Sequence, residues 1–305
     1  MLACLSQRFP IEFNSTDYIT QAKERKQVES HLRVCLKMDG ALQTMTTRSP
    51  SEPILSEAAY VVMQRQSFNA PNALKSVMED FPISKGDRGE YLVLLLLVLA
   101  RDATVGVPDQ FGRPITGRRW FGLSDFLYGQ LFRMQTPSSR TVDKRSIKAL
   151  NMLEKDFPEA RLHFNHYVKV HEQEAIDTVS LLLLQGRGAA VLCADNQTGL
   201  DAINVFLREG TQLIRDSAGL VLSQIKNHSK YTKTPQQKLF DAMDLYDLGI
   251  LSKRDAAVPL IKIVLPSLQR LPVSMLSATY QQASMMQLFM RFGVLGDLYS
   301  HFWPN

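Results

Sequence analysis

The chain has 305 residues, of which 45% are hydrophobic and 21% charged, and its formal net charge is +5. These values are typical of a folded protein with a sizeable core, exclude an intrinsically disordered chain, and fit one or two domains. The mild positive charge is compatible with a polyanionic partner but is too small to establish one.

Cysteine usage and hydropathy indicate a cell compartment. Cys4, Cys35 and Cys193 are odd in number and lack CxxC spacing, which argues against a disulfide framework or a zinc site. The opening MLACLSQRFPIEF has no basic stretch followed by a long apolar core, as a signal peptide would. The longest apolar run, Leu92–Ala100, is far shorter than the roughly 20 residues that cross a bilayer. We therefore expect an intracellular protein, cytoplasmic or nuclear, with no membrane attachment.

Residues 1–83 predict a helical N-terminal extension. Val28, Leu32 and Cys35 recur at helical spacing. Ser56 is placed to cap a helix through EAAYVVMQR, and a further helix is expected over Ala73–Asp80.

The strongest predicted helix covers Lys85–Asp102. Ser84 is a suitable N-cap, and Asp87 and Glu90 lie in the first turns, where the helix dipole favours acids. The remainder is apolar on nearly all sides, which predicts deep burial. On its own, Glu90 is interpreted as a helix N-terminal acid that faces Arg88 or solvent.

Residues 103–185 predict a large helical insertion. It begins with a basic loop rich in Gly and Pro over Thr104–Arg119. Helices are expected over Asp125–Phe132, Lys144–Lys155 and Ala160–Leu184.

Three short strands are then predicted over Ala189–Cys193, Asp201–Leu207 and Gly219–Lys226, because turn residues separate their apolar runs. The side-chain period of a strand is two, so Gln224 and Lys226 share one face of the third strand. A helix is expected over Gln237–Leu251 and a fourth strand over Ala257–Leu265. Residues 266–305 predict a helical C-terminal extension, mainly over Ser274–Tyr299.

An acid at the start of one strand, followed by Gln-x-Lys at the end of the next, resembles the active site of the PD-(D/E)XK, or restriction-endonuclease-like, nuclease superfamily. In that family an Asp on the second core strand precedes (E/Q)-x-K on the third, and a Glu on the helix before the first strand completes the site. Asp201, Gln224 and Lys226 match this motif, and Glu90 is the best upstream match. The pattern RGE…LLLLVLARD…QTGLD…QIKN also resembles fungal nuclease-like proteins related to the C-terminal modules of crinkler-type proteins.

The resemblance implies an α/β (α+β) fold, with a small mixed β-sheet core flanked by helices over residues 84–265. It implies Mg²⁺ or Mn²⁺ as cofactor, held by Glu90, Asp201 and the backbone carbonyl of Ile225. Lys226 would orient the attacking water and offset charge in the transition state, and Gln224 would coordinate weakly or hold a water. DNA or RNA is the implied partner, with contacts expected from Arg187, Asn227, Lys230 and Lys233.

Two departures from the motif keep other interpretations open. Gln224 stands where a Glu would add a negative charge, and Gly199-Leu200 precede Asp201 where the family has a Pro. Taken singly, Asp201 is a turn residue after Gly199 and Lys226 a surface lysine at a strand end. The chain is therefore interpreted as a nuclease, as a catalytically inactive member of the same fold that binds nucleic acid or a protein, or as a helical scaffold.

Overall fold

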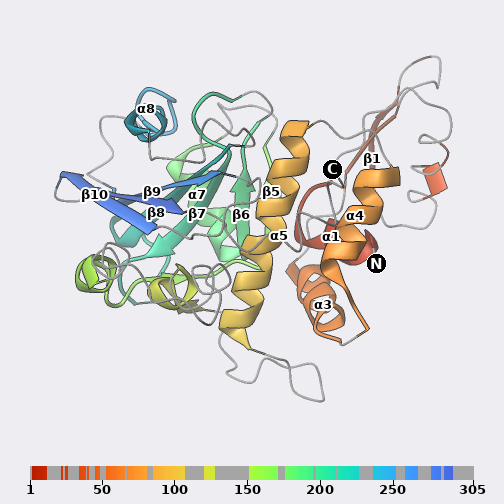
Figure 1. Cartoon of the computed structure of the whole chain (residues 1–305), viewed down its shortest axis with the longest axis horizontal. Coiled ribbons are helices and arrows are strands. Elements are labelled where there is room, and N and C mark those ends of the chain that lie inside the picture. Colours follow the sequence, from red (N-terminus) through yellow and green to blue (C-terminus); the bar gives the residue numbers. More distant parts are fainter. Residues whose placement is uncertain are drawn as a thin grey trace.

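A computed structural model of the chain describes residues 2–11, 22, 25–26, 34–38, 40, 45–48, 53–65, 67–80, 85–106, 120–127, 151–170, 176–194, 197–210, 212–226, 236–251, 258–266, 276–282 and 285–290. This part of the chain is a mixed α+β protein built on a nine-stranded mixed sheet with helices against it (Figure 1). The predicted α+β class is confirmed at this level. Among the helices described, none has the length and hydrophobicity needed to cross a bilayer.

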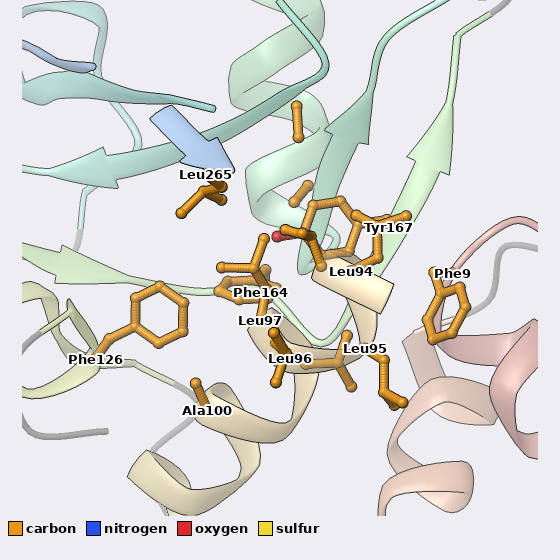
Figure 2. Packing of buried hydrophobic residues seen from close by; sticks show 14 of the residues in the cluster. Phe9, Leu94, Leu95, Leu96, Leu97, Ala100, Phe126, Phe164, Tyr167 and Leu265 are labelled. Carbon is orange, nitrogen blue, oxygen red and sulfur yellow. The ribbon is translucent and has the colours of Figure 1, made fainter. Parts of the chain in front are cut away.

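Helix α5, Lys85–Val105, divides the molecule. The sheet lies on one side of it, and α1 (Leu2–Arg8), α3 (Pro53–Met63) and α4 (Ala70–Asp80) lie on the other (Figure 1). Helix α5 is apolar on nearly all sides, and it is covered by the sheet on one side and by the N-terminal helices on the other. Every residue from Tyr91 to Val98 is therefore buried. Figure 2 shows its leucines packed between Phe9 on one side and Leu265 and Phe164 on the other. The predicted buried helix is confirmed, and it continues three residues further.

The three predicted strands exist and pair with one another. Strands β6 (Ala189–Leu192), β7 (Ala202–Leu207) and β8 (Ala218–Lys226) form an antiparallel meander. Strand β9, Leu260–Pro266, then runs parallel to β8. The connection between them contains helix α8, Gln237–Asp241, which is shorter than the predicted helix Gln237–Leu251.

Both faces of this central sheet are buried, so its strands are apolar throughout rather than alternating. Phe206, Val221 and Ile263 belong to the core cluster that includes α5. The alternate positions, such as Ile203 and Leu222, belong to a second cluster with residues of α8 and of helix α7, Thr178–Gly186. Successive side chains along each strand therefore point alternately toward α5 and toward α7 and α8.

The predicted helical insertion is wrong in part. Within residues 103–185 the structure contains β3 (Phe121–Gly122), β4 (Arg161–Leu162) and β5 (His166–Lys169). Strand β5 pairs in parallel with β6, and β4 pairs with β7. The helix predicted over Ala160–Leu184 is therefore limited to α7. The segment HYVK is short and contains a Tyr and a β-branched Val, and its pairing with a strand 23 residues later decides its state.

The two extensions are also not purely helical. Strands β1 (Val34–Met38) and β2 (Met45–Arg48) form an antiparallel pair inside the predicted N-terminal helical region. Strands β10 (Leu276–Gln282) and β11 (Met285–Met290) stand where a C-terminal helix was predicted. Strand β11 pairs in parallel with β9 and β10 pairs with β11, so this hairpin extends the central sheet. Met and Leu accommodate either state, and the available sheet edge favours the strand.

Buried charges fasten the N-terminal helices to the end of α5. The guanidinium of Arg8 meets both carboxylate oxygens of Asp102, at 2.6 and 3.0 Å, and its Nε donates to the carbonyl of Asn165 at 2.7 Å. Arg101 bridges the Asp102 carboxylate at 3.2 Å and that of Glu57 at 2.6 Å. Burial alone would raise the pKa of Glu57, but Arg101, the Asn165 amide and Arg8 together lower it.

Candidate active site

A row of side chains crosses the sheet at the end where β6 and β8 finish and β7 begins. Continuing the β7–β8 register by one position pairs Asp201 with Gln224, and the Asp201 N–H donates to the Ser223 carbonyl at 3.0 Å. On the other side, the Cys193 N–H donates to the Asp201 carbonyl at 2.8 Å. Paired residues of antiparallel strands point to the same face. Cys193, Asp201 and Gln224 therefore lie side by side, and we call them the site row.

Lys226 lies two residues beyond Gln224 on the same strand and so on the same face. Its side chain is partly exposed at the end of β8. Its positive charge opposes the rise that burial causes in the pKa of Asp201. The structure thus places Asp201, Gln224 and Lys226 on one face at the end of the sheet.

The Asp201 carboxylate is held in surroundings that do not favour its charge. Burial raises the pKa of Asp201, although a hydrogen bond from the Ile225 N–H at 2.5 Å and the charge of Lys226 oppose that effect. The residue is still partly exposed. A cation beside this carboxylate would offset the unfavourable desolvation and remain within reach of solvent.

Gln224 carries an unsatisfied acceptor at the same place. The residue is only 2% exposed, and its Oε1 has no hydrogen-bond partner in the part of the chain that the structure describes. A buried polar atom without a partner costs about 1–3 kcal/mol. Oxygen donors of this kind, with a carboxylate alongside, are the ligands that Mg²⁺ prefers.

Glu90 lies in the second turn of α5, partly exposed, on the helix that covers the opposite face of the sheet. One observation connects it to the site row. Burial raises the pKa of the Cys193 thiol, and the charges of Asp201 and Glu90 raise it further. Glu90 belongs to α5, on the α5 side of the sheet, whereas Asp201 and Gln224 lie on the face toward α7 and α8.

The other predicted contacts are placed differently. Ile225 is buried and its N–H is used by Asp201, and its side chain belongs to the α5 cluster. Arg187 is exposed just before β6, at the far end of that strand from Cys193, about 20 Å along an extended chain. The structure does not bring Arg187 to the site row. Asn227, Lys230 and Lys233 lie outside the described residues.

Cys193 is the one member of the site row that the sequence motif missed. Only the pairing of β6 with β7 places it beside Asp201. Its thiol is buried, and its raised pKa keeps it protonated at neutral pH. A protonated thiol is a poor ligand for a hard cation, so Cys193 shapes the site rather than binding in it.

A cavity of about 320 Å³ lies elsewhere, near the C-terminal end of α5. Its lining includes Thr104, Trp120, Asp125 and Arg161, and no member of the site row. This cavity is therefore separate from Asp201, Gln224 and Lys226.

Among the residues that the structure describes, no three His, Cys, Asp or Glu side chains gather as a metal-binding group. The fit for a cation therefore depends on one carboxylate and on amide and carbonyl oxygens. No protein-family model, no curated protein and no solved structure matches the chain.

Proposed function

We propose that the protein is a metal-dependent nuclease, using Mg²⁺ or Mn²⁺ to hydrolyse phosphodiester bonds in DNA or RNA. The observation that carries the proposal is the Gln224 Oε1, which has no partner among the described residues, beside the Asp201 carboxylate and with Lys226 on the same face. Oxygen donors, a nearby ammonium group and a partly open position are what this chemistry requires.

Each side chain has a role in this proposal. Asp201 and Gln224 would hold the cation through their side-chain oxygens, with the Ile225 carbonyl as a further donor. Glu90, the other carboxylate that the resemblance implies, belongs to the helix on the opposite face of the sheet and is given no metal contact. A bound Mg²⁺ would supply charge stabilisation at the phosphate and a more acidic bound water. Lys226 would hold the attacking water and offset the negative charge that grows on the phosphate oxygens.

The order of elements supports a restriction-endonuclease-like fold. Helix α5 precedes the meander, Asp201 leads into its second strand, and Gln-x-Lys ends its third. This is the arrangement that the resemblance requires of the helix and the two strands. The parallel pairing of β8 with β9 makes the core a mixed sheet, also as expected.

The alternative is a catalytically inactive protein of the same fold that binds nucleic acid or a protein partner. The amide of Gln224 in place of a carboxylate favours it, because it removes a negative charge from the site and weakens metal binding. Glu90 also belongs to the helix on the opposite face of the sheet.

A cleavage assay tests the proposal. Fluorescently labelled single-stranded DNA, duplex DNA and RNA are incubated with the protein in Mg²⁺, in Mn²⁺ or in EDTA. We expect metal-dependent cleavage that falls at least about 100-fold in Asp201→Asn and in Lys226→Met. Lys238→Met, which removes an exposed lysine of α8, is the matched control and keeps full activity. If no substrate is cleaved in either metal, the nuclease proposal is refuted. If all three variants still bind nucleic acid, that result supports the inactive binding protein.

Thermal denaturation provides a readout that does not need activity. Because burial raises the pKa of Asp201, the neutral Asn isostere relieves an unfavourable charge. Asp201→Asn should therefore raise the Tm at neutral pH, and the gain should shrink as falling pH protonates Asp201 in the wild type. Mg²⁺ should raise the Tm of the wild type and leave that of Asp201→Asn unchanged. A Tm that responds equally to Mg²⁺ in both proteins would place any cation elsewhere.

A further inference from the structure

The cavity of about 320 Å³ at the C-terminal end of α5 has a volume within the range of roughly 300–1,000 Å³ that small-molecule sites have. Its walls come from the last residues of α5, from β3 and from residues 158–161. Arg161 in this wall pairs with Leu207 at the end of β7, whereas Asp201 precedes the start of that strand, about 20 Å away along an extended chain. We call it the α5-end cavity, and it is remote from the site row.

Hydrogen bonds and packing fix the walls of the α5-end cavity. The Leu123 N–H donates to the Ala160 carbonyl at 2.8 Å, which joins the segment after β3 to the segment before β4. Phe121 and Ala160 are buried. The half-buried indole of Trp120 lies against the ring of His163, and the two ring centroids are 4.9 Å apart. The cavity therefore has a preformed aromatic wall.

Asp125 gives the cavity a negative charge. A Cβ atom built on Gly122 would lie 2.6 Å from Asp125 Oδ2, so the carboxylate occupies the space that the missing side chain leaves. Asp125 is exposed, and within the described part of the chain it has no hydrogen-bond or ion-pair partner. Glu159 and Arg161 also line the cavity, and their charges offset each other, with 4.0 Å between Oε2 and Nη2. The unbalanced charge in the lining is therefore negative.

The end of α5 adds to this negative character. The carbonyl end of a helix carries a partial negative charge of about half a unit, which a basic residue in the last turn would offset. The last turn of α5 contains no basic residue. Thr104, which lines the cavity, donates its hydroxyl to the Ala100 carbonyl at 2.8 Å, and its oxygen is still able to accept a hydrogen bond. The lining thus combines hydrogen-bond acceptors, negative charge and an aromatic ring.

We propose that the α5-end cavity binds a small organic molecule through a primary ammonium group. Such a group has a positive charge, three N–H donors and no acceptor, which matches a carboxylate, a hydroxyl oxygen and the carbonyl end of a helix. The face of an indole ring also attracts a cation. An anionic ligand would instead meet the charge of Asp125. The inference does not depend on the nuclease proposal, because no member of the site row lines this cavity.

Fluorescence of Trp120 tests the proposal in the full chain. The sequence has two tryptophans, Trp120 and Trp303, so the Trp303→Phe variant reports on the cavity alone. This parent protein is titrated at neutral pH with pentylammonium chloride, with pentanol and with tetramethylammonium chloride. We expect a saturable change for pentylammonium, with a dissociation constant of about 1–5 mM. Pentanol, which has no charge, and tetramethylammonium, which has no N–H group, should each bind at least about 5-fold more weakly.

Three variants in the same background locate the ammonium group. Asp125→Asn keeps the shape of the side chain without its charge and should weaken pentylammonium binding at least about 10-fold. Gly122→Ala keeps the charge but displaces the carboxylate, and it should weaken binding at least about 3-fold. Glu154→Gln is the matched control, because Glu154 is exposed and lies outside the cavity lining, and it should bind as the parent does.

Thermal denaturation shows whether each variant is folded, and the comparison of ligands in the parent protein decides the question even if a variant is not. The absence of a saturable response up to about 50 mM pentylammonium overturns the proposal. So does pentanol or tetramethylammonium binding as tightly as pentylammonium. The same holds if folded Asp125→Asn or Gly122→Ala binds pentylammonium no more weakly than Glu154→Gln.

Discussion

Replacement of Arg8 by methionine should destabilise the protein strongly. Arg8 is 0% exposed and makes two hydrogen bonds to the Asp102 carboxylate, at 2.6 and 3.0 Å, and one to the Asn165 carbonyl at 2.7 Å. The Arg8→Met variant loses the guanidinium group that pairs with Asp102. Of the two arginines that contact this carboxylate, Arg101, at 3.2 Å, is the one that remains. Removing one partner of a buried ion pair costs about 3–5 kcal/mol. That is a large part of the roughly 5–15 kcal/mol that stabilises a typical protein.

Urea denaturation followed by far-ultraviolet circular dichroism measures this cost. We expect the midpoint to fall while the slope with denaturant stays unchanged, since the variant removes contacts without altering the surface exposed on unfolding. Arg8→Lys should lose less, because the ammonium group keeps the charge but cannot make the forked contact. In the double variant Arg8→Met/Asp102→Asn, the cost should be smaller than the sum of the two single costs. A loss below about 1 kcal/mol in Arg8→Met would show that the network does not hold α1 to α5.

Two further predictions concern His166 and Gly199. Burial, with the charges of Arg8 and Arg187, lowers the pKa of His166 to about 4. Because the pKa of a histidine in the unfolded chain is about 6.5, the unfolded state binds a proton before the folded state does. The free energy of unfolding should therefore fall by roughly 3 kcal/mol as the pH drops from about 6.5 to 4. His166→Gln should flatten that part of the stability–pH curve, and equal slopes in both proteins would contradict the assignment. Gly199 has a φ of +85°, and an added Cβ would lie 2.2 Å from the Ala242 carbonyl oxygen, so Gly199→Ala should cost about 2–4 kcal/mol in urea denaturation. Gly210→Ala, at a φ of +68° with nothing within 4 Å, should cost only about 1 kcal/mol, and a similar loss in both variants would refute the steric argument.

The core helix and the meander were predictable because their signals are local. Helix α5 has an acid in its first turn and a long apolar run, and turn residues separate β6, β7 and β8. The β7–β8 pairing also follows, since a short connection favours an antiparallel neighbour. These elements carry Asp201, Gln224 and Lys226, which explains why the sequence could bring those three together.

The elements that the sequence missed depend on distant partners. Strand β5 is a strand because β6 lies beside it, and β11 because β9 offers an edge. No periodicity within either segment contains that information. Cys193 joins the site row through register alone, and the contact of Arg8 with Asp102 joins residues 94 positions apart. Contacts between residues so far apart in the sequence can be identified only once the fold is known.

The two polar groupings of the molecule are satisfied to different degrees, and this contrast bears on function. Around Arg8 and Arg101, buried charges pair with carboxylates and carbonyls, as a structural network must. In the site row, burial raises the pKa of Asp201 and the Gln224 oxygen has no described partner. Natural proteins tend to break local rules at functional sites, where a ligand supplies what the fold leaves out.

If the site row belonged to a protein that has lost its activity, substitutions that remove the buried charge of Asp201 or the unpaired oxygen of Gln224 would stabilise the protein at no functional cost. The proposed nuclease instead requires that the same substitutions stabilise it and abolish cleavage, which makes the paired measurement of Tm and activity in Asp201→Asn the decisive one.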